Sequence, residues 1–382
     1  MELATRVFDV VTDKENIYPA IRELLPEITN EVKKMYWRRV LRMAALCHDI
    51  GHLPFSHAAE EDLLPPGWNH ERFTRELIES HEMQSIWNKL TPPLRPEDIV
   101  KLAVGPRKAP DLKFTDWEAI LAEIIVGDSF GVDRMDYLLR DSYYTGVAYG
   151  KFDHYRLIDT LKILPPPGID NDAYQEGSIE PSLGVEVGGL QSAEALLLAR
   201  YFMFTQVYLH RVRRIYDIHL KDFLCTWLPG NKFSTDLETH LSLTDNEIIA
   251  AISHVSREPN HAGHKHARRF INRNHFKLLY ERNPGDIEKN PEAVIFIYKE
   301  TIKKFGPGNV RRDSYKKRSG ESYFPVLAMD GRIISSESLS VALRNMPESN
   351  VDCVFVESSI LNDARHWLKK KLNDIIAMNK ED

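Results

Sequence analysis

One segment concentrates side chains that can bind a metal ion or move a proton: Leu-Cys-His-Asp-Ile-Gly-His-Leu-Pro-Phe-Ser-His, residues 46–57. Five of the fifteen histidines fall between His48 and His81. Imidazole is a common metal ligand that titrates near neutral pH, and the carboxylate of Asp49 adds a hard oxygen donor. A His-Asp doublet at the end of a helix can direct two ligands into one cavity. By itself, a capped helix with a hydrogen-bonded histidine explains the doublet equally well.

The element that must position this doublet is a long helix. Between Glu31 and His48, side chains repeat at helical spacing in two adjacent stripes: Tyr36, Val40, Met43 and Cys47, and beside them Trp37, Leu41, Ala44 and His48. Such a broad apolar surface is typical of a helix that is buried in a large helical core. Gly51 suits a chain that leaves helical geometry after the doublet.

Most of the chain before residue 284 has helical periodicity. Further helices are predicted at residues 70–90, 116–126, 131–141, 191–227 and 245–256, with a short β-like run at 183–187. Beyond residue 284, strands are predicted at 293–298, 323–329 and 351–356, and helices at 338–346 and 361–378. We therefore predict a mainly α protein, with a helical core over residues 1–284 and a small α+β C-terminal region over residues 285–382.

The composition excludes several classes of protein. The 382 residues have a net charge of −6, with 43% hydrophobic and 28% charged residues, a globular balance that argues against disorder and broad nucleic-acid binding. The three cysteines lie far apart without a CxxC pair, which argues against a disulfide framework and a cysteine zinc site. No apolar run reaches the ~18 residues needed to cross a bilayer. We expect a cytoplasmic protein without a membrane partner.

A basic segment interrupts this acidic chain. It comprises Lys303, Lys304, Arg311, Arg312 and Lys316–Arg318, between predicted strands. We favour a solvated loop for this segment. The alternative is a loop that binds an anion or a partner, and nucleic-acid binding rests on this segment alone.

The motif at residues 48–57, His-Asp-Ile-Gly-His-x-Pro-Phe-Ser-His, resembles the signature of HD-domain metal-dependent phosphohydrolases. It is most similar to the branch of deoxynucleoside triphosphate (dNTP) triphosphohydrolases, which includes bacterial dGTPases and the sterile-alpha-motif/HD-domain enzyme of animal cells. The further matching segments are Trp68–Glu71, Gly131–Asp141, Arg200, Tyr208–Val212, Leu243–Asp245 and Arg273–Phe276. The resemblance implies an HD-domain helical core that hydrolyses a dNTP to deoxynucleoside and tripolyphosphate, and a homo-oligomer.

The resemblance also implies a site for one divalent metal ion, held by two histidines and two aspartates. His48, Asp49 and Asp133 match the last three of these ligands. Imidazole and carboxylate donors suit Mn, Fe, Mg or Zn. The first histidine of the family pattern would precede Met1, because Met1–Ala4 is similar to residues that follow that histidine. We therefore expect a chain truncated ahead of this ligand and incompletely loaded with metal.

Further roles follow from the resemblance alone. Acid–base positions are matched by His52, Glu60 and His70. Phosphate-contacting positions are matched by His57, Arg134, Tyr137 and Arg200. Sugar-contacting positions are matched by Asp141, at the 3′-hydroxyl, and Tyr208, under C2′. Arginines from two helices can clamp a triphosphate, because each guanidinium offers paired donors to phosphate oxygens.

Two other functions stay open on the sequence. Another HD-type phosphomonoesterase or phosphodiesterase would not need Arg134, Tyr137 and Arg200 as a triphosphate clamp. A non-catalytic nucleotide-binding regulator would explain a missing first metal ligand. Release of tripolyphosphate discriminates against the first alternative, and metal content with turnover discriminates against the second.

Overall fold

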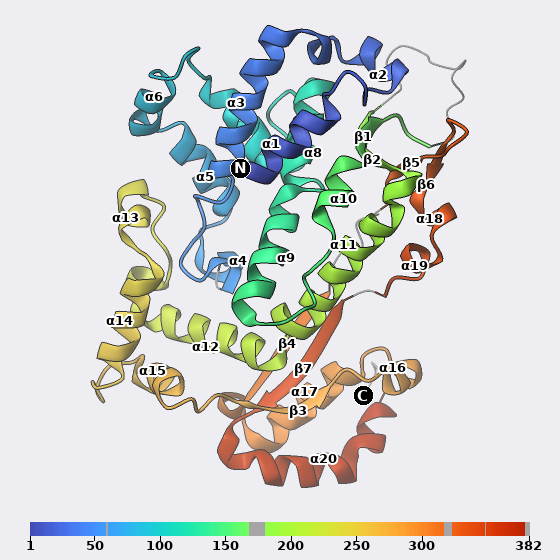
Figure 1. Cartoon of the computed structure of the whole chain (residues 1–382). Helices are drawn as coiled ribbons and strands as arrows, with labels where there is room; N and C mark the ends of the chain where they lie inside the picture. Colours follow the sequence, from blue (N-terminus) through green and yellow to red (C-terminus); the bar gives the residue numbers. More distant parts are fainter. Residues whose placement is uncertain (59, 168–179, 317–322, 348, 379–382) are drawn as a thin grey trace. The chain divides into compact units, whose positions relative to one another are not determined.

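The computed structural model describes residues 1–58, 60–167, 180–316, 323–347 and 349–378. Helices predominate over these residues (Figure 1), which confirms the predicted mainly α class. Contacts divide the chain into two compact units. The first unit comprises Met1–His52, Trp68–Met203 and Ser319–Pro347, and the second unit comprises Leu53–Gly67, Phe204–Arg318 and Glu348–Asp382.

The first unit is built mainly of helices. They are α1 (Glu2–Val11), α2 (Pro19–Leu24), η1 (Pro26–Thr29), α3 (Glu31–Cys47), α5 (His70–Ile78), α6 (His81–Trp87), α7 (Pro96–Val104), α8 (Asp116–Val126), α9 (Val132–Thr145), α10 (His154–Asp159), η3 (Val187–Gly189), α11 (Leu190–Met203), α18 (Ser336–Leu339) and α19 (Val341–Arg344). Asn30 caps α3 by accepting a hydrogen bond from the Lys33 amide, and Thr115 and Glu118 form a capping box on α8. Helices α3, α7 and α8 contact one another, and each buries a leucine completely: Leu41, Leu102 and Leu121.

A four-stranded sheet completes the first unit. Its order is β1 (Leu161–Leu164), β2 (Ser182–Glu186), β5 (Pro325–Leu327) and β6 (Ile333–Ser335). Strands β2 and β5 run parallel, and the other two pairs are antiparallel. Gly184 lets β2 approach β5 closely, since a Cβ there would lie 2.2 Å from the Pro325 carbonyl oxygen. The strand predicted at 323–329 is therefore present, but it belongs to the sheet of the first unit.

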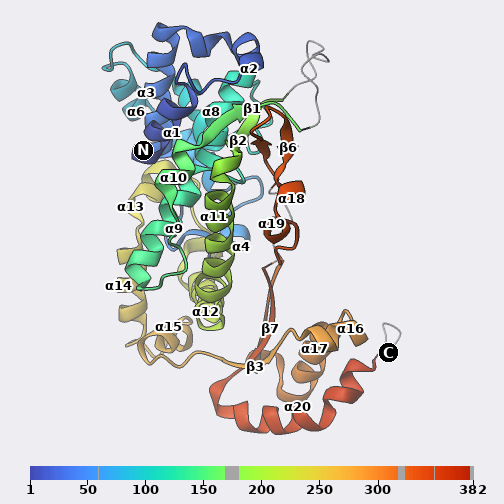
Figure 2. The ribbon, with the colours of Figure 1, turned by 45° about the vertical axis from the view of Figure 1, so that its right-hand side comes forward.

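The second unit combines helices with a three-stranded antiparallel sheet of order β3–β7–β4. The strands are β3 (Lys277–Glu281), β4 (Val310–Lys316) and β7 (Asn350–Val356). The helices are η2 (Ser56–Ala58), α4 (Glu60–Leu63), the π-helix η4 (Phe204–Tyr208), α12 (Arg211–Trp227), η5 (Pro229–Asn231), α13 (Leu237–Ser242), α14 (Asp245–Val255), α15 (His264–Ile271), α16 (Pro284–Lys289), α17 (Ala293–Phe305), η6 (Pro307–Asn309), η7 (Ser358–Ile360) and α20 (Leu361–Ile376). In Figure 2, β3 and β7 lie beside helices α17 and α20. Helices α17 and α20 pack together, and Ile297, Val354 and Leu368 belong to their shared core.

Several predicted elements differ from the structure. The strand predicted at 293–298 is the first half of helix α17, because Ala293, Val294, Ile297 and Thr301 are buried at helical spacing. A short β-branched run is ambiguous by sequence, and here packing decides. The helices predicted at 70–90 and 338–346 are each two shorter helices, and 191–227 contains α11, η4 and α12. The predicted domain boundary at residue 284 stays a prediction, because the division into compact units does not test which residues form a functional domain.

The basic segment is not the predicted loop. Lys303 and Lys304 lie in the last turn of α17, and Arg311 and Arg312 lie in β4. Arg311 pairs with Asp222 at 3.1 Å and Arg312 with Asp352 at 2.7 Å. Lys317 and Arg318 lie outside the described residues. Within the ranges described above, no helix is both long and apolar enough to cross a membrane.

Candidate functional site

The three predicted metal ligands of the first unit converge at the ends of two helices. His48 caps the C-terminus of α3, Asp49 follows it, and Asp133 lies in the first turn of α9. His48 Nε2 is 3.1 Å from Asp133 Oδ1 and 3.3 Å from Asp49 Oδ2. The potential ligand atoms of the three residues all lie within 4.8 Å of one another. The structure therefore brings together residues that are far apart in sequence.

These donors fit a divalent cation. His48 Nδ1 lies 3.2 Å from the Ala45 carbonyl oxygen, so it donates its hydrogen there and Nε2 faces the carboxylates. An Nε2 lone pair beside two carboxylates is repulsive unless a proton or a metal ion lies between them. One imidazole and two carboxylates are donors that borderline and hard divalent ions accept. The set is therefore suited to a metal ion.

The electrostatics of the ligands agree with this assignment. Burial disfavours the charged form of His48, but the hydrogen bond to Asp133 and the nearby carboxylates outweigh burial and raise its pKa. Burial works against the charge of Asp49 as well, yet the hydrogen bond from His52 and the neighbouring histidines lower the pKa of Asp49. The site thus favours positive charge between ionised carboxylates.

The turn that carries His48 and Asp49 is held by helix α5. The Gly51 amide donates to Thr74 Oγ1 at 3.1 Å, and Thr74 Oγ1 donates to the His48 carbonyl oxygen at 3.1 Å. A Cβ on Gly51 would lie 2.2 Å from the Thr74 amide nitrogen, so glycine is required here by close packing. Thr74 was missed from the sequence. The sequence signal for Thr74 is a hydroxyl among the buried residues of α5, because a buried hydroxyl needs a hydrogen-bond partner.

Two predicted acid–base histidines lie beside the metal ligands. The rings of His52 and His70 are stacked, with centroids 4.1 Å apart and planes 10° apart. His52 Nε2 is 3.5 Å from Asp49 Oδ1. His70 Nε2 is 3.4 Å from Glu71 Oε1, which also accepts Lys108 Nζ at 2.7 Å. The histidine pair is therefore linked to a ligand at one end and to a Lys-Glu ion pair at the other.

Three arginines of the first unit surround one aspartate. Arg134 donates to Asp128 Oδ1 at 2.8 Å and to the Gly127 carbonyl at 2.6 Å. Arg107 donates to Asp128 Oδ2, and Arg200 Nη1 lies 3.4 Å from the Asp128 carbonyl oxygen. Arg107, Arg134, Arg200 and Asp128 are called the arginine cluster below. Its predicted members are Arg134 and Arg200; Arg107 and Asp128 lie in loops and carried only weak sequence signals.

The other predicted substrate residues of the first unit lie on α9. The Tyr137 hydroxyl is hydrogen-bonded to Arg200, and burial raises the pKa of Tyr137. Burial and the charge of Arg134 lower the pKa of Arg200. Asp141 follows Tyr137 by one helical turn and shares its side of α9.

The second unit holds His57 and Glu60. His57 Nδ1 is 3.0 Å from Glu60 Oε2. Phe55 and Ser56 both have positive φ, 60° and 54°, a strained conformation for residues with a Cβ. The Phe55 amide donates to Asp245 Oδ1 at 2.8 Å, so Asp245 at the start of α14 holds this strained segment.

Tyr208 also belongs to the second unit. It ends the π-helix η4, a conformation that is often found at functional sites. Its ring packs edge-on against Phe204 at 5.2 Å, and its carbonyl accepts from Arg213 Nη1 at 2.8 Å. The aromatic side chain is therefore oriented from within its own unit.

Comparisons with known proteins agree with this geometry. Residues 27–138 match the HD domain, and residues 152–305 match the HD associated region. The chain therefore contains an HD domain, and His48, Asp49 and Asp133 lie within it.

Individual relatives are distant. The chain is 28% identical to the uncharacterized protein YwfO of Bacillus subtilis over 281 residues, which is 69% of this chain and 58% of YwfO. It is 28% identical to human deoxynucleoside triphosphate triphosphohydrolase SAMHD1 over 301 residues, 68% of this chain and 45% of SAMHD1. A crystal structure of a hypothetical protein from Aquifex aeolicus superposes with a TM-score of 0.70 at 29% identity, covering 96% of this chain and 86% of that one. The chain spans only about a third to three fifths of the curated relatives it matches.

Proposed function

We propose that this HD-domain chain is a metal-dependent phosphohydrolase that cleaves a dNTP to deoxynucleoside and tripolyphosphate. One observation carries the proposal: Asp133 and Arg134 are consecutive residues of α9, and one belongs to the metal-ligand set while the other belongs to the arginine cluster. The N-terminal end of α9 therefore contributes residues to both a candidate cation site and a candidate phosphate site. The distant likeness to SAMHD1, which is named for this activity, supports the choice of substrate class.

The phosphate chain is bound by arginines in this mechanism. Arg134 and Arg200 come from two helices and converge on the loop around Asp128, so their guanidinium forks can bind oxygens of one polyphosphate. Tyr137, hydrogen-bonded to Arg200, orients that guanidinium. A divalent ion held by His48, Asp49 and Asp133 would supply Lewis-acid polarisation of a phosphoryl oxygen.

Proton transfer to the leaving 5′-oxygen is assigned to the stacked histidines. His52 Nε2 faces Asp49, and His70 Nε2 faces Glu71, so each imidazole is oriented by a carboxylate. The stacked rings lie 4.1 Å apart, so both imidazoles are placed at one position beside Asp49. The roles of Glu60 in acid–base chemistry and of His57 in phosphate contact are carried over from the family resemblance.

Recognition of the deoxyribose completes the proposal. Asp141 would accept the sugar 3′-hydroxyl, and the Tyr208 ring would pack under C2′ and reject a 2′-hydroxyl. Self-association, also implied by the resemblance, belongs to the proposal and would be measured by sedimentation velocity.

The test combines product analysis with metal analysis. The chain is incubated with each of the four dNTPs and Mn²⁺, Fe²⁺, Mg²⁺ or Zn²⁺, and anion-exchange chromatography separates tripolyphosphate from pyrophosphate and phosphate. Asp133→Asn should lower metal affinity and turnover by about 100-fold or more, because it removes a charged donor from the ligand set. Asp136→Asn is the matched control, since Asp136 is an exposed aspartate of the same helix that pairs with Arg140.

Two results would contradict this proposal. Release of pyrophosphate or phosphate in place of tripolyphosphate would assign the chain to another phosphohydrolase reaction. Normal metal content and turnover in Asp133→Asn would remove the metal site.

A further inference from the structure

The arginine cluster holds more positive charge than its carboxylate can neutralise. Arg107 and Arg134 each donate to one oxygen of Asp128, and Arg200 reaches only the carbonyl oxygen of that residue. Two guanidinium groups therefore share one carboxylate, and the third contacts the backbone of the same residue. Burial lowers the pKa of Arg200, and the nearby charge of Arg134 lowers it further. Guanidinium groups that outnumber the carboxylates beside them favour an anionic ligand.

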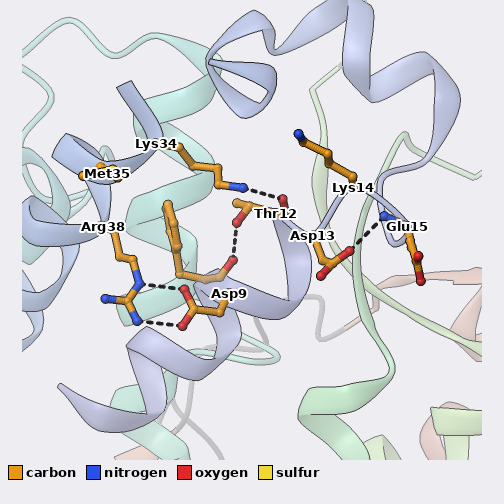
Figure 3. A pocket seen from close by; sticks show the side chains of 9 residues that line it. Asp9, Thr12, Asp13, Lys14, Glu15, Lys34, Met35 and Arg38 are labelled. Carbon is orange, nitrogen blue, oxygen red and sulfur yellow. Dashed lines mark hydrogen bonds and ion pairs between the residues drawn. The ribbon is translucent and has the colours of Figure 1, made fainter. Parts of the chain in front are cut away.

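An ordinary arginine pair elsewhere in the same unit shows the difference. Figure 3 shows Arg38 and Asp9 side by side, with Nε 2.6 Å from Oδ1 and Nη2 2.7 Å from Oδ2. This bidentate pair satisfies both carboxylate oxygens with one guanidinium and has no excess charge. In the arginine cluster, by contrast, the two oxygens of Asp128 are divided between two guanidiniums.

The backbone directs Arg107 toward the cluster. Helix α7 ends at Gly105, whose φ of 78° and ψ of 162° turn the chain away from the helix. The next residues are Pro106, Arg107 and Lys108, and Lys108 is anchored to Glu71 at 2.7 Å. The loop is therefore held on both sides of Arg107. The Arg107 side chain is 80% exposed, in contrast to 17% for Arg134, so it has room to reorient.

We propose that Arg107 is a third phosphate-binding arginine, which adapts the site to a chain of three phosphates. Asp128 occupies the position of a phosphate in the ligand-free protein, because guanidinium binds carboxylate and phosphate oxygens with the same fork geometry. When a polyphosphate binds, Arg107 moves its donors from Asp128 to the terminal phosphate, while Arg134 keeps its bond to the Gly127 carbonyl. This inference rests on the proposed function, and it adds the residue that distinguishes a triphosphate from shorter phosphates.

Binding of inorganic polyphosphates tests the inference without turnover. Isothermal titration calorimetry at fixed ionic strength and free Mg²⁺ measures the Kd of tripolyphosphate, pyrophosphate and phosphate. Arg107→Gln should weaken tripolyphosphate binding about tenfold, the loss expected for one charge-assisted contact, and change phosphate binding less than twofold. The tripolyphosphate affinity of Arg107→Lys should lie between those of Arg107→Gln and the natural chain. Arg38→Gln, which removes the bidentate arginine of Figure 3, should leave all three affinities unchanged.

The outcomes separate this inference from the proposed hydrolysis. Equal tripolyphosphate affinity in Arg107→Gln and the natural chain, or no tripolyphosphate binding to the natural chain, would overturn it. A tenfold loss confined to tripolyphosphate supports it, even if no dNTP is hydrolysed. If dNTPs are hydrolysed and KM is the same in Arg107→Gln, the inference fails while the hydrolase stands.

Discussion

Two groups of arginines in this chain differ in the number of carboxylates that pair with them. In the second unit, Arg214 pairs with Asp313, Arg311 with Asp222 and Arg312 with Asp352, so each guanidinium has its own carboxylate. In the arginine cluster of the first unit, Arg107 and Arg134 share the Asp128 carboxylate, and Arg200 contacts the Asp128 carbonyl oxygen. The basic segment that is conspicuous in the sequence is thus neutralised in the structure, and the group that carries excess charge is assembled from three distant segments.

The difference separates structural arginines from binding arginines. A guanidinium that is paired one-to-one with a half-buried carboxylate gains little from an added anion, because the anion must displace a partner already in place. A guanidinium that shares its carboxylate gains a full partner when an anion binds. The ratio of arginines to carboxylates therefore predicts function better than the number of basic residues in a segment.

The largest expected effect tests the one-to-one pairs. Asp313→Asn should lower the free energy of unfolding by about 3 kcal/mol, because Arg214 would lose its close carboxylate partner in a half-buried place and keep only the 4.0 Å contact with Asp217. Urea denaturation followed by circular dichroism measures the loss. The same variant should bind tripolyphosphate with unchanged affinity. A stable variant with weakened tripolyphosphate binding would reverse the assignment of the two groups.

A second, intermediate effect concerns Glu123, a carboxyl on α8 that faces the arginine cluster. Glu123 Oε2 accepts the Leu183 amide at 3.1 Å, and burial, helped by the charge of Asp128, raises the pKa of Glu123 from 4.5 to about 7. The folded chain therefore holds a proton that the unfolded chain releases near pH 4.5. The free energy of unfolding should fall as the pH rises through this window and become level above pH 7.

Glu123→Gln isolates this contribution, since the amide oxygen can still accept the Leu183 amide. Relative to the variant, the natural chain should lose on the order of 2 kcal/mol of stability between about pH 5 and pH 8. Urea denaturation at each pH measures both proteins. Parallel pH profiles would mean that Glu123 is ionised throughout, so that the cluster has a second carboxylate and the contrast between the two groups weakens.

The smallest effect on stability is expected at the shared carboxylate itself. Asp128→Asn makes the same chemical change as Asp313→Asn, but it should alter the free energy of unfolding by less than about 1 kcal/mol, because Asp128 and its partner Arg107 are more exposed to solvent than Asp313 and Arg214. Tripolyphosphate should bind about threefold more tightly, since the competing carboxylate is gone. Loss of stability equal to that of Asp313→Asn, with no gain in affinity, would place both aspartates in the same structural role.

Most of the fold could be predicted from periodicity, because long helices have strong patterns. The predicted helix at 116–126 coincides with α8, and the strand predicted at 351–356 is β7. The strand at 323–329 was found as β5, but no local pattern could reveal that it pairs with β2 rather than with β7. Residues 293–298 were misread because valine and isoleucine favour strands in general, whereas here they pack on one face of a helix.

The candidate site was predictable where its residues form a motif. His48, Asp49 and Asp133 were named from the sequence, and the structure brings them together, although their role as ligands stays a prediction. Thr74, Asp128 and Arg107 were not named, because their contacts join segments more than 20 residues apart in the sequence. Such pairings are products of the fold and leave no spacing in the sequence.

The first unit is formed by three separate stretches of the chain, so it cannot be complete until the last of them has been synthesised. Its metal-ligand candidates have all been translated once α9 is made, yet β5, which pairs with β2 in its sheet, is translated nearly two hundred residues later. Until then the edge of β2 is open, and the emerging chain has to keep it from pairing with other strands. Ribosome-bound chains that stop short of β5 should consequently be the form of this protein most in need of a chaperone.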